Sequence, residues 1–279
     1  MKKFTNWLSN YLSSQYDIHL TRIEQTTILG KTYEVIRGTT REKPDYDDAW
    51  LYALSREAEF IFDIGCNIGQ SSLLMMHNNN VKNILLVDPN PTALSQAAQN
   101  LILNGLSSKA HFICAFATNK TDEKIEFFTI GSGAAGSAYA SHAKTAAKMQ
   151  SSSFVPTLTI DSLVEIHTFI PDLVKIDVEG AETLVLIGAQ ALAKHQKTRF
   201  FIEMHSSPIS MYDNAIKIID WCHNNNYKGW YLKDKFLLTS PYQISHRGRC
   251  HLLLLPKNIP FPQYLLPIQQ GASLDEVIN

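Results

Sequence analysis

The stretch from Phe60 to Ser71 constrains the fold of this chain more than any other segment. Its first five residues are apolar except for Asp63, which predicts a buried strand. Two glycines, Gly65 and Gly69, follow at a spacing of four residues, and an amphipathic run starts directly after them. Glycine lets a backbone pass close to a ligand because it has no Cβ, and the first turn of a helix has free N–H groups. A strand, a glycine loop and a helix in this order predict a site for a nucleotide cofactor.

The loop differs from the dinucleotide-binding fingerprint, which has three glycines and places a pyrophosphate at the helix start. Here the pattern is D-x-G-x-N-x-G, with Asp63 at the mouth of the loop. A carboxylate there would repel a pyrophosphate, but it would suit a ligand that carries an ammonium group. S-adenosylmethionine (SAM) carries an ammonium, a sulfonium and no phosphate. The loop therefore favours SAM, with Asp63 as one of its contacts.

A second acidic residue supports the same prediction. Asp88 ends the apolar run 84–87 and lies 19 residues after Gly69. An acidic residue about 20 positions further on, at the end of the second strand, binds the ribose hydroxyls of a nucleotide. Each of these residues also has a structural explanation. The glycines could form an ordinary turn and Asp88 could cap a helix, and for any one residue alone this explanation is as good as a cofactor site. Their joint spacing favours a SAM site, and we expect the adenine near the end of the third strand, around Ala115.

Composition excludes several classes of protein. The chain has 279 residues, of which 45% are hydrophobic and 18% charged, so it can form a large core. Its net charge of −1 gives no basic surface for nucleic acid or an anionic membrane. No run of about 18 apolar residues predicts a membrane span. The four cysteines have no metal-binding spacing, which indicates reduced thiols and a cytoplasmic location.

Strands and helices then alternate along the chain, which predicts an α/β fold with a doubly wound, mostly parallel sheet and right-handed crossovers. The alternating segments are strand 60–64, helix 68–78, strand 84–88, helix 91–103 and strand 110–115. Later strands are expected at 124–130, 155–160, 174–176, 200–202, 229–232, 236–238 and 250–255, and later helices at 181–194 and 211–226.

The ends of the chain are expected to extend this domain. Residues 1–50 predict a short helix at 4–14, which is a possible homodimer contact, and a hairpin at 26–38 with Gly30-Lys31 as its turn. A helix is expected at 48–58. Residues 51–256 form the predicted catalytic domain, and 257–279 a proline-rich tail that is either an extended wrap or a flexible end.

A stretch of small residues, 131–153, is too long for an ordinary loop. It is interpreted as either a lid on the substrate side or a mobile insertion. After it, Asp161 is expected to cap the helix that follows strand 155–160.

Acidic residues follow the buried strand 174–176. Asp177 lies at the carboxyl end of this strand, where open parallel sheets bind ligands. We therefore expect Asp177 and Glu179 to lie beside the glycine loop and to take part in function. Glu182 is assigned to the helix dipole instead.

The next predicted strand is followed by Glu203 and His205. Alternation places these two side chains on the same side of the strand. Histidine titrates near neutrality and is a common general base for an alcohol proton. A structural histidine is the alternative, but the position of His205 at a strand end favours catalysis, with Glu203 orienting its imidazole.

Five sequence blocks resemble the FkbM family of SAM-dependent methyltransferases, in the same order. They are FDIGCNIG (62–69), VDPNP (87–91), TLTIDSL (157–163), KIDVEGAE (175–182) and IEMH (202–205). The resemblance covers roughly residues 58–207. The KIDVEGAE block is specific to the family, whereas the glycine loop occurs throughout class I methyltransferases. Asp88 stands where the family often has Glu. Both residues have a carboxylate, so Asp88 can still accept hydrogen bonds from the ribose hydroxyls.

The resemblance implies a seven-stranded class I methyltransferase sheet that a final hairpin with one antiparallel strand closes. It also implies methylation of a hydroxyl on a small molecule, and we expect a sugar, glycan or glycolipid. It assigns the glycine loop and Asp88 to SAM. Together with the sequence arguments above, the residues that we expect to bind SAM are Asp63, Gly65, Asn67, Gly69, Asp88, Asn90, Ala115 and Asp177. Those that the resemblance assigns to the transfer site are Asp177, Glu179, Glu203 and His205.

In the predicted mechanism His205 takes the hydroxyl proton and the oxygen attacks the methyl group in line. No metal is expected, but a variant places a divalent cation on Asp177, Glu203 and His205, as in a metal-dependent O-methyltransferase of a polyketide or other natural product. Less favoured are a nicotinamide oxidoreductase, which the missing third glycine opposes, and a nucleic-acid methyltransferase, which the neutral charge opposes. A binding module without catalysis would not need these acids and the imidazole at one edge.

Overall fold

The computed structural model describes residues 23–41, 43, 45–130, 136–139, 143–206 and 209–278. The predicted helix at 4–14 lies outside this part of the chain, and so does the homodimer contact proposed for it. None of the described helices is long and apolar enough to cross a membrane.

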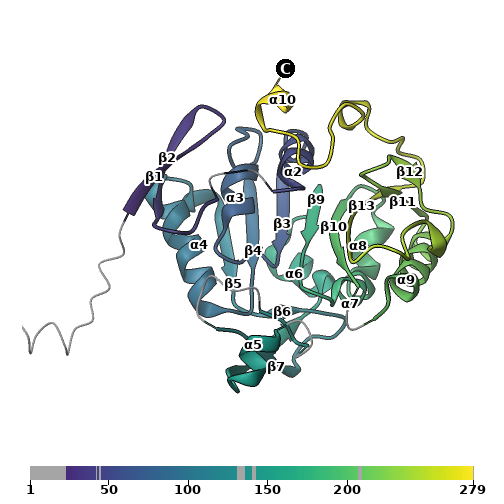
Figure 1. The fold of residues 1–279 in the computed structure, drawn as a ribbon, viewed down its shortest axis with the longest axis horizontal. Helices are drawn as coiled ribbons and strands as arrows, with labels where there is room; N and C mark the ends of the chain where they lie inside the picture. The colour runs from purple at the N-terminus through teal and green to yellow at the C-terminus, as the bar shows by residue number, and fades with distance from the viewer. Residues whose placement is uncertain are drawn as a thin grey trace, which may run out of the picture.

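A central sheet of eight strands organises the molecule, in the order β12-β11-β13-β10-β9-β3-β4-β5 (Figure 1). Its strands are β3 (Phe60–Ile64), β4 (Asn83–Val87), β5 (Ala110–Ile113), β9 (Leu173–Ile176), β10 (Arg199–His205), β11 (Tyr227–Tyr231), β12 (Phe236–Leu237) and β13 (Arg249–Pro256). The strands from β10 to β5 run parallel, and β13 is antiparallel to both of its neighbours. This confirms the predicted fold class, although the sheet has eight strands where the family resemblance implied seven.

Helices cover both faces of this sheet, as a doubly wound fold requires (Figure 1). One core lies between the sheet and α2 (Asp48–Ser55), α3 (Gln70–Met75) and α4 (Pro91–Leu103). The other lies between the sheet and α6 (Ile160–His167), α7 (Glu182–Ile187), α8 (Gln190–Lys194) and α9 (Met211–Asn224). The chain moves outward from β3 to β5 and then returns to β9 on the other side of β3. The strand order therefore switches between β3 and β9, where such sheets bind their ligands.

The N-terminal hairpin consists of β1 (Ile23–Ile28) and β2 (Lys31–Ile36). Ile28 pairs with Lys31, so the turn is Leu29-Gly30, with φ of 50° and 75°, and the predicted turn at Gly30-Lys31 was wrong by one residue. Positive φ at both central residues is typical of a type I′ turn, which matches the twist of the strands. Tyr33 is fully buried against the α2–α4 core, so the hairpin shares that core.

The C-terminal segment wraps the same side of the sheet. After β13 it includes the 3₁₀ turn η3 (Gln263–Leu265) and α10 (Asp275–Ile278). Leu265 and Ile268 are buried in the α2–α4 core, and the Trp50 indole donates to the Ile268 carbonyl (3.3 Å). Of the two interpretations of this tail, the extended wrap describes the structure.

A small second sheet, β6-β8-β7, lies at the carboxyl end of the main sheet. It contains β6 (Phe116–Ala117), β7 (Lys124–Phe128) and β8 (Ser152–Leu158), with α5 (Lys144–Lys148) before β8. The remaining 3₁₀ turns are η1 (Ser107–Lys109) and η2 (Pro241–Gln243). The end of the predicted 131–153 loop is therefore regular structure, and residues 131–135 and 140–142 lie outside the described part.

Two local predictions were wrong for identifiable reasons. The helix expected at 181–194 divides into α7 and α8 around Gly188, which packs so closely that a Cβ there would lie 2.3 Å from the Thr118 carbonyl oxygen. Thr159, not Asp161, caps α6. The Asp161 carboxylate instead accepts the backbone N–H groups of Ala191 and Leu192 (2.8 Å each) at the start of α8.

Candidate active site

The glycine loop joins β3 to α3, and the packing of the protein itself requires its two glycines. Gly65 has φ of 77°, and a Cβ there would lie 1.7 Å from the Asp177 carbonyl oxygen at the end of β9. Gly69 has φ of 81°, and its Cβ would lie 2.7 Å from that of Ala97 in α4. From the sequence, we expected these glycines to let the backbone approach a bound ligand. In the structure, they let the loop pack closely against the end of β9 and against α4.

Asp88 holds the loop in place from the end of β4. Its carboxylate accepts the backbone N–H of Asn67 (2.8 Å) and that of Asn90 (2.8 Å). Burial raises the pKa of Asp88 to about 6, and these two hydrogen bonds oppose the shift. Asn90 caps α4 by accepting from Thr92 and Ala93, so Asp88 is not the helix cap.

A cavity of about 60 Å³ opens beside this loop, and we call it the smaller cavity. All of the predicted cofactor residues except Asp63 and Gly69 line it. Its lining residues are Ile64, Gly65, Asn67, Val87, Asp88, Pro89, Asn90, Ala115, Phe116, Ala117, Phe127, Gly136, Asp177, Val178 and Glu179. The lining combines apolar side chains, such as Phe116 and Phe127, with the carboxylates of Asp88, Asp177 and Glu179.

Asp63 does not reach either cavity, which contradicts its predicted contact with a ligand. The side chain is fully buried, and its Oδ2 accepts the hydroxyls of Ser71 (2.7 Å) and Ser72 (2.6 Å). Its other oxygen lies 3.4 Å from the Lys175 ammonium. The ammonium that this carboxylate pairs with therefore belongs to the protein itself.

Lys175 is a buried cation between two carboxylates. Its Nζ donates to the Gly65 carbonyl oxygen (2.9 Å) and lies 3.4 Å from Asp177 Oδ2 as well as from Asp63. Burial lowers the pKa of Lys175, but the Asp63 and Asp177 carboxylates outweigh it and raise the pKa above its ordinary value. Lys175 thus joins the glycine loop to the end of β9.

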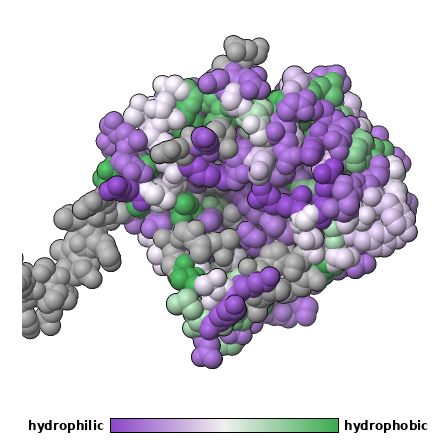
Figure 2. Space-filling model, in the orientation of Figure 1, coloured by the Kyte–Doolittle hydropathy of each residue, from purple (hydrophilic) through white to green (hydrophobic). Residues whose placement is uncertain are grey.

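A larger cavity of about 400 Å³ also borders the glycine loop. It shares Gly65, Asn67, Asp177 and Glu179 with the smaller cavity. Its other lining residues are Gly38, Thr39, Thr40, Arg41, Asp45, Asp47, Asp48, Leu51, Cys66, Ile68, Gln70, Ser71, Lys175, Glu203 and Arg249. Most of these side chains are charged or polar, and the face of the molecule drawn in Figure 2 is likewise mostly hydrophilic.

His205 lies at the end of β10 in a cage of carboxylates. Its Nδ1 is 2.9 Å from Glu182 Oε1, and its Nε2 is 3.5 Å from both Glu179 and Glu203. Burial lowers the pKa of His205, but Glu182 and Glu203 reverse this and raise the pKa to about 11. The side chain is buried and lines neither cavity. His205 therefore lies beside Glu203 and Glu179, as predicted, but it is not among the residues that line the two cavities.

Glu203 links His205 to the next strand. Its Oε1 forms an ion pair with Arg249 (2.9 Å), and its side chain lines the larger cavity. Although burial opposes it, contacts with His205, His251 and Arg249 hold the pKa of Glu203 below its usual range. Asp177, which lines both cavities, has its pKa raised to about 7 by burial, against the lowering effect of Lys175.

Sequence reasoning missed several residues of this site. Lys175 interrupts the apolar run 173–176, and a charge in such a run signals a buried ion pair, so it was detectable. Glu182 was assigned to the helix dipole, yet its buried carboxylate accepts the Gly180 N–H (2.8 Å) and contacts His205. Arg249 and Asp47 reach the site from distant parts of the chain, which spacing alone does not reveal.

Solved structures and curated proteins were compared with the chain. The chain resembles an FkbM methyltransferase from Methylobacillus flagellatus KT at 16% identity and a TM-score of 0.46. The match covers 71% of this chain and 43% of that one, so this chain spans less than half of the length of that protein. It resembles M. jannaschii TYW2 in complex with AdoMet at 14% identity and a TM-score of 0.42, over 83% and 84% of the two chains. A precorrin-6y C5,15-methyltransferase from Geobacter metallireducens GS-15 matches at 10% identity and a TM-score of 0.41, over 74% and 85%. None of the curated proteins matches.

A family model carries the assignment. The model described as the methyltransferase FkbM domain matches residues 63–228, which is more than half of the chain. This span contains every predicted site residue. The predicted family and the predicted cofactor, SAM, are thereby confirmed. The chain belongs to the FkbM family of SAM-dependent methyltransferases.

Proposed function

We propose that the chain transfers the methyl group of SAM to a hydroxyl of a small molecule, and that this acceptor is a sugar, glycan or glycolipid. The observation that carries the proposal is the wall shared by the two cavities. Gly65, Asn67, Asp177 and Glu179 line both of them. SAM bound in the smaller cavity would therefore meet, at these four residues, a methyl acceptor bound in the larger one.

The smaller cavity suits the adenosine part of SAM. Ala115, Phe116 and Phe127 supply apolar surface for the adenine, and Asp88 supplies a carboxylate for the ribose hydroxyls. SAM is larger than this cavity, so the methionine part would continue past Asn67 toward the larger one. The methyl group would then lie at the shared wall.

The larger cavity suits a hydroxylated acceptor. Its charged and polar side chains offer hydrogen-bond donors and acceptors in several directions, among them Thr40, Arg41, Asp48 and Arg249. Sugars present hydroxyls in several directions, whereas an apolar acceptor would leave these polar groups unpaired.

We infer that Asp177 takes the proton of the acceptor hydroxyl and that His205 is a positioning residue. Asp177 lines both cavities, so it can contact an acceptor at the shared wall. His205 lines neither of them, and it contacts Glu179, Glu182 and Glu203 instead. The sequence-based assignment of His205 as the base stays a prediction, and it requires the imidazole to leave this cage.

A panel of sugars, glycans and glycolipids incubated with SAM tests the function, with release of S-adenosylhomocysteine as the readout. Methylated product at an oxygen supports the proposal. Products methylated only at nitrogen or carbon contradict it. Calorimetry with SAM and with a nicotinamide dinucleotide on the same protein separates methyl transfer from the oxidoreductase alternative.

Two isosteric variants test the base. Asp177→Asn should lower kcat by about 10²–10⁴, the usual contribution of a general base. His205→Gln should raise the KM of the acceptor more than it lowers kcat, because it disturbs the positions of Glu179 and Glu203. If His205→Gln lowered kcat by this amount and Asp177→Asn did not, His205 would be the base. Activity that excess chelator removes would favour a metal-dependent mechanism. One group that could hold the ion is Asp177, Glu203 and His205, whose ligand atoms lie within 4.8 Å of one another.

A further inference from the structure

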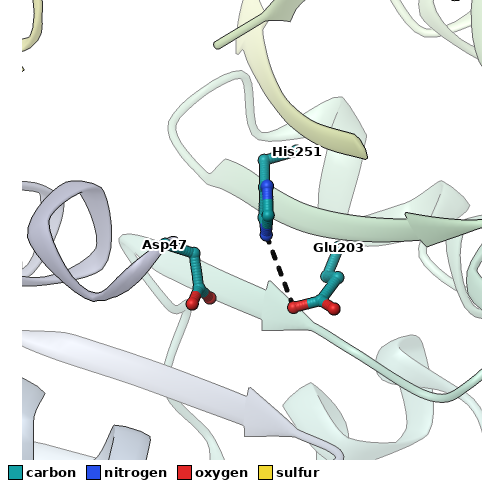
Figure 3. A group of neighbouring side chains, drawn as sticks. All are labelled: Asp47, Glu203 and His251. Atoms are coloured by element: carbon teal, nitrogen blue, oxygen red, sulfur yellow. Dashed lines mark ion pairs between the residues drawn. The ribbon is translucent and has the colours of Figure 1, made fainter. Parts of the chain in front are cut away.

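A second group of potential ligands adjoins the acceptor side of the site, away from His205. It consists of Asp47, Glu203 and His251, whose ligand atoms all lie within 4.8 Å of one another (Figure 3). This group could not be predicted from sequence spacing, because Asp47 precedes α2 and His251 lies in β13, more than 200 residues later. We propose that these three side chains form a binding site for a divalent transition-metal ion.

The fold fixes the three positions independently of any ligand. Glu203 and His251 are direct partners across the antiparallel pair β10–β13, so their side chains project from the same face of the sheet. The His251 ring packs between Trp50 (5.6 Å between ring centroids) and Phe201 (6.0 Å). Asp47 is brought over this face by α2. Figure 3 shows the polar ends of all three side chains gathered around one space.

Two of these side chains are buried, and a ring nitrogen of one of them makes no hydrogen bond. His251 is 2% exposed, and its Nε2 makes no hydrogen bond to any residue that the structure describes, although Glu203 Oε2 lies 3.4 Å away. Asp47 is 8% exposed and occupies the N-cap position of α2, yet its carboxylate makes no capping hydrogen bond. A buried imidazole nitrogen that lacks a hydrogen bond costs free energy. A cation between His251 and the Asp47 carboxylate would compensate this cost.

Glu203 is already oriented for such a role. Its Oε1 is held by Arg249 (2.9 Å), which leaves Oε2 facing His251 Nε2. Partners of this kind fix the orientation of a metal-binding carboxylate. Asp47 and Glu203 also line the larger cavity, so the remaining coordination positions would face the acceptor space.

The neighbouring group of Asp177, Glu203 and His205 is less suited to a metal. Both ring nitrogens of His205 already face carboxylates, Glu182 at 2.9 Å and Glu179 at 3.5 Å. Asp177 pairs with the Lys175 ammonium at 3.4 Å. A metal there would have to displace these contacts, whereas the 3.4 Å contact of His251 Nε2 is with Glu203, itself one of the proposed ligands.

The donor set indicates the class of ion. Two carboxylates and one imidazole form a mixed oxygen and nitrogen site, which suits Mn²⁺, Fe²⁺ or Zn²⁺ better than the all-oxygen cages of Ca²⁺ or Mg²⁺. Three protein ligands leave positions open for water or for the oxygens of an acceptor.

Titration of the full-length chain with Mn²⁺, followed by the EPR signal of the free ion, tests the site without SAM or an acceptor. We expect one ion to bind per chain. Asp47→Asn and His251→Gln should each weaken Mn²⁺ binding by at least about tenfold, because each removes a direct ligand and even indirect partners contribute 10–100-fold. Anomalous scattering from crystals soaked in Mn²⁺ locates the ion in the unmodified protein, independently of how well any variant folds.

Matched controls separate coordination from general charge. Asp45→Asn removes a carboxylate from the wall of the same cavity, and His77→Gln removes a histidine that contacts Tyr33 and Tyr52 and does not line this cavity. Both should change the affinity by less than about threefold, within the context dependence of such contacts. The proposal is overturned if Mn²⁺ does not bind, if Asp45→Asn weakens binding as much as Asp47→Asn, or if the ion lies among Asp177, Glu203 and His205. Absence of Mn²⁺ binding, or equal effects of the Asp45 and Asp47 variants, would leave the proposed methyl transfer untouched, whereas an ion among Asp177, Glu203 and His205 would also favour the metal-dependent alternative.

Discussion

Replacement of Lys175 by methionine tests whether the buried ion pairs hold the site together. The Lys175 side chain is 5% exposed and that of Asp63 is 0% exposed, so neither is screened by water. Removal of the ammonium would leave the Asp63 carboxylate with only the hydroxyls of Ser71 and Ser72. It would also leave the Gly65 carbonyl oxygen without its donor.

The expected loss of stability follows from this geometry. Removing one partner of a buried ion pair costs about 3–5 kcal/mol, because the other charge stays buried without compensation. We therefore expect the free energy of unfolding of Lys175→Met to fall by about 3–5 kcal/mol. Urea denaturation followed by circular dichroism measures it by linear extrapolation. Lys109→Met is the matched control, since Lys109 donates only to the Val81 carbonyl oxygen near the surface.

A second variant separates the lost ion pair from lost packing. Asp63→Asn in the Lys175→Met background removes the uncompensated charge and keeps the shape of the side chain. It should restore part of the stability that Lys175→Met loses, whereas a packing defect would not respond. A loss below about 1 kcal/mol for Lys175→Met, the range of surface pairs, would refute the account of this cluster.

Two further predictions concern the cofactor side. Because burial raises the pKa of Asp88 to about 6, its carboxylate is ionised at pH 7.5 and mostly protonated at pH 5. The Kd of SAM measured by calorimetry should rise by about tenfold over this range if the ionised form binds the ribose, and Asp88→Asn should remove that pH dependence. Gly65→Ala places a Cβ 1.7 Å from the Asp177 carbonyl oxygen at a positive φ, so it should abolish SAM binding and lower the Tm. Gly248→Ala, with no heavy atom within 4 Å of its Cβ, should do neither. An unchanged Tm in Gly65→Ala would contradict the packing around this loop.

The sequence was most informative where the determinants are local. α4 begins and ends at the predicted residues, 91 and 103, because Asn90 caps it and Pro91 suits its first turn. The end of β3 and the acid at Asp88 were likewise located correctly. Each depends on residues a few positions apart.

The parts that sequence reasoning missed depend on contacts between distant segments. The break at Gly188 arises from the Thr118 backbone, about 70 residues earlier, which no helical pattern records. Asp63 looked like a ligand contact because its buried partner, Lys175, lies in another strand. The pairing of Glu203 with His251 requires the register of β10 and β13, and that register becomes visible only once the sheet is assembled.

The central claim is that SAM crosses from the smaller cavity to the wall shared with the larger one. A crystal structure with S-adenosylhomocysteine bound tests it most directly. We expect the adenine beside Ala115 and Phe116, the ribose on Asp88, and the sulfur at the wall formed by Gly65, Asn67 and Asp177. A cofactor bound elsewhere, or one whose sulfur faces away from Asp177, would contradict the claim.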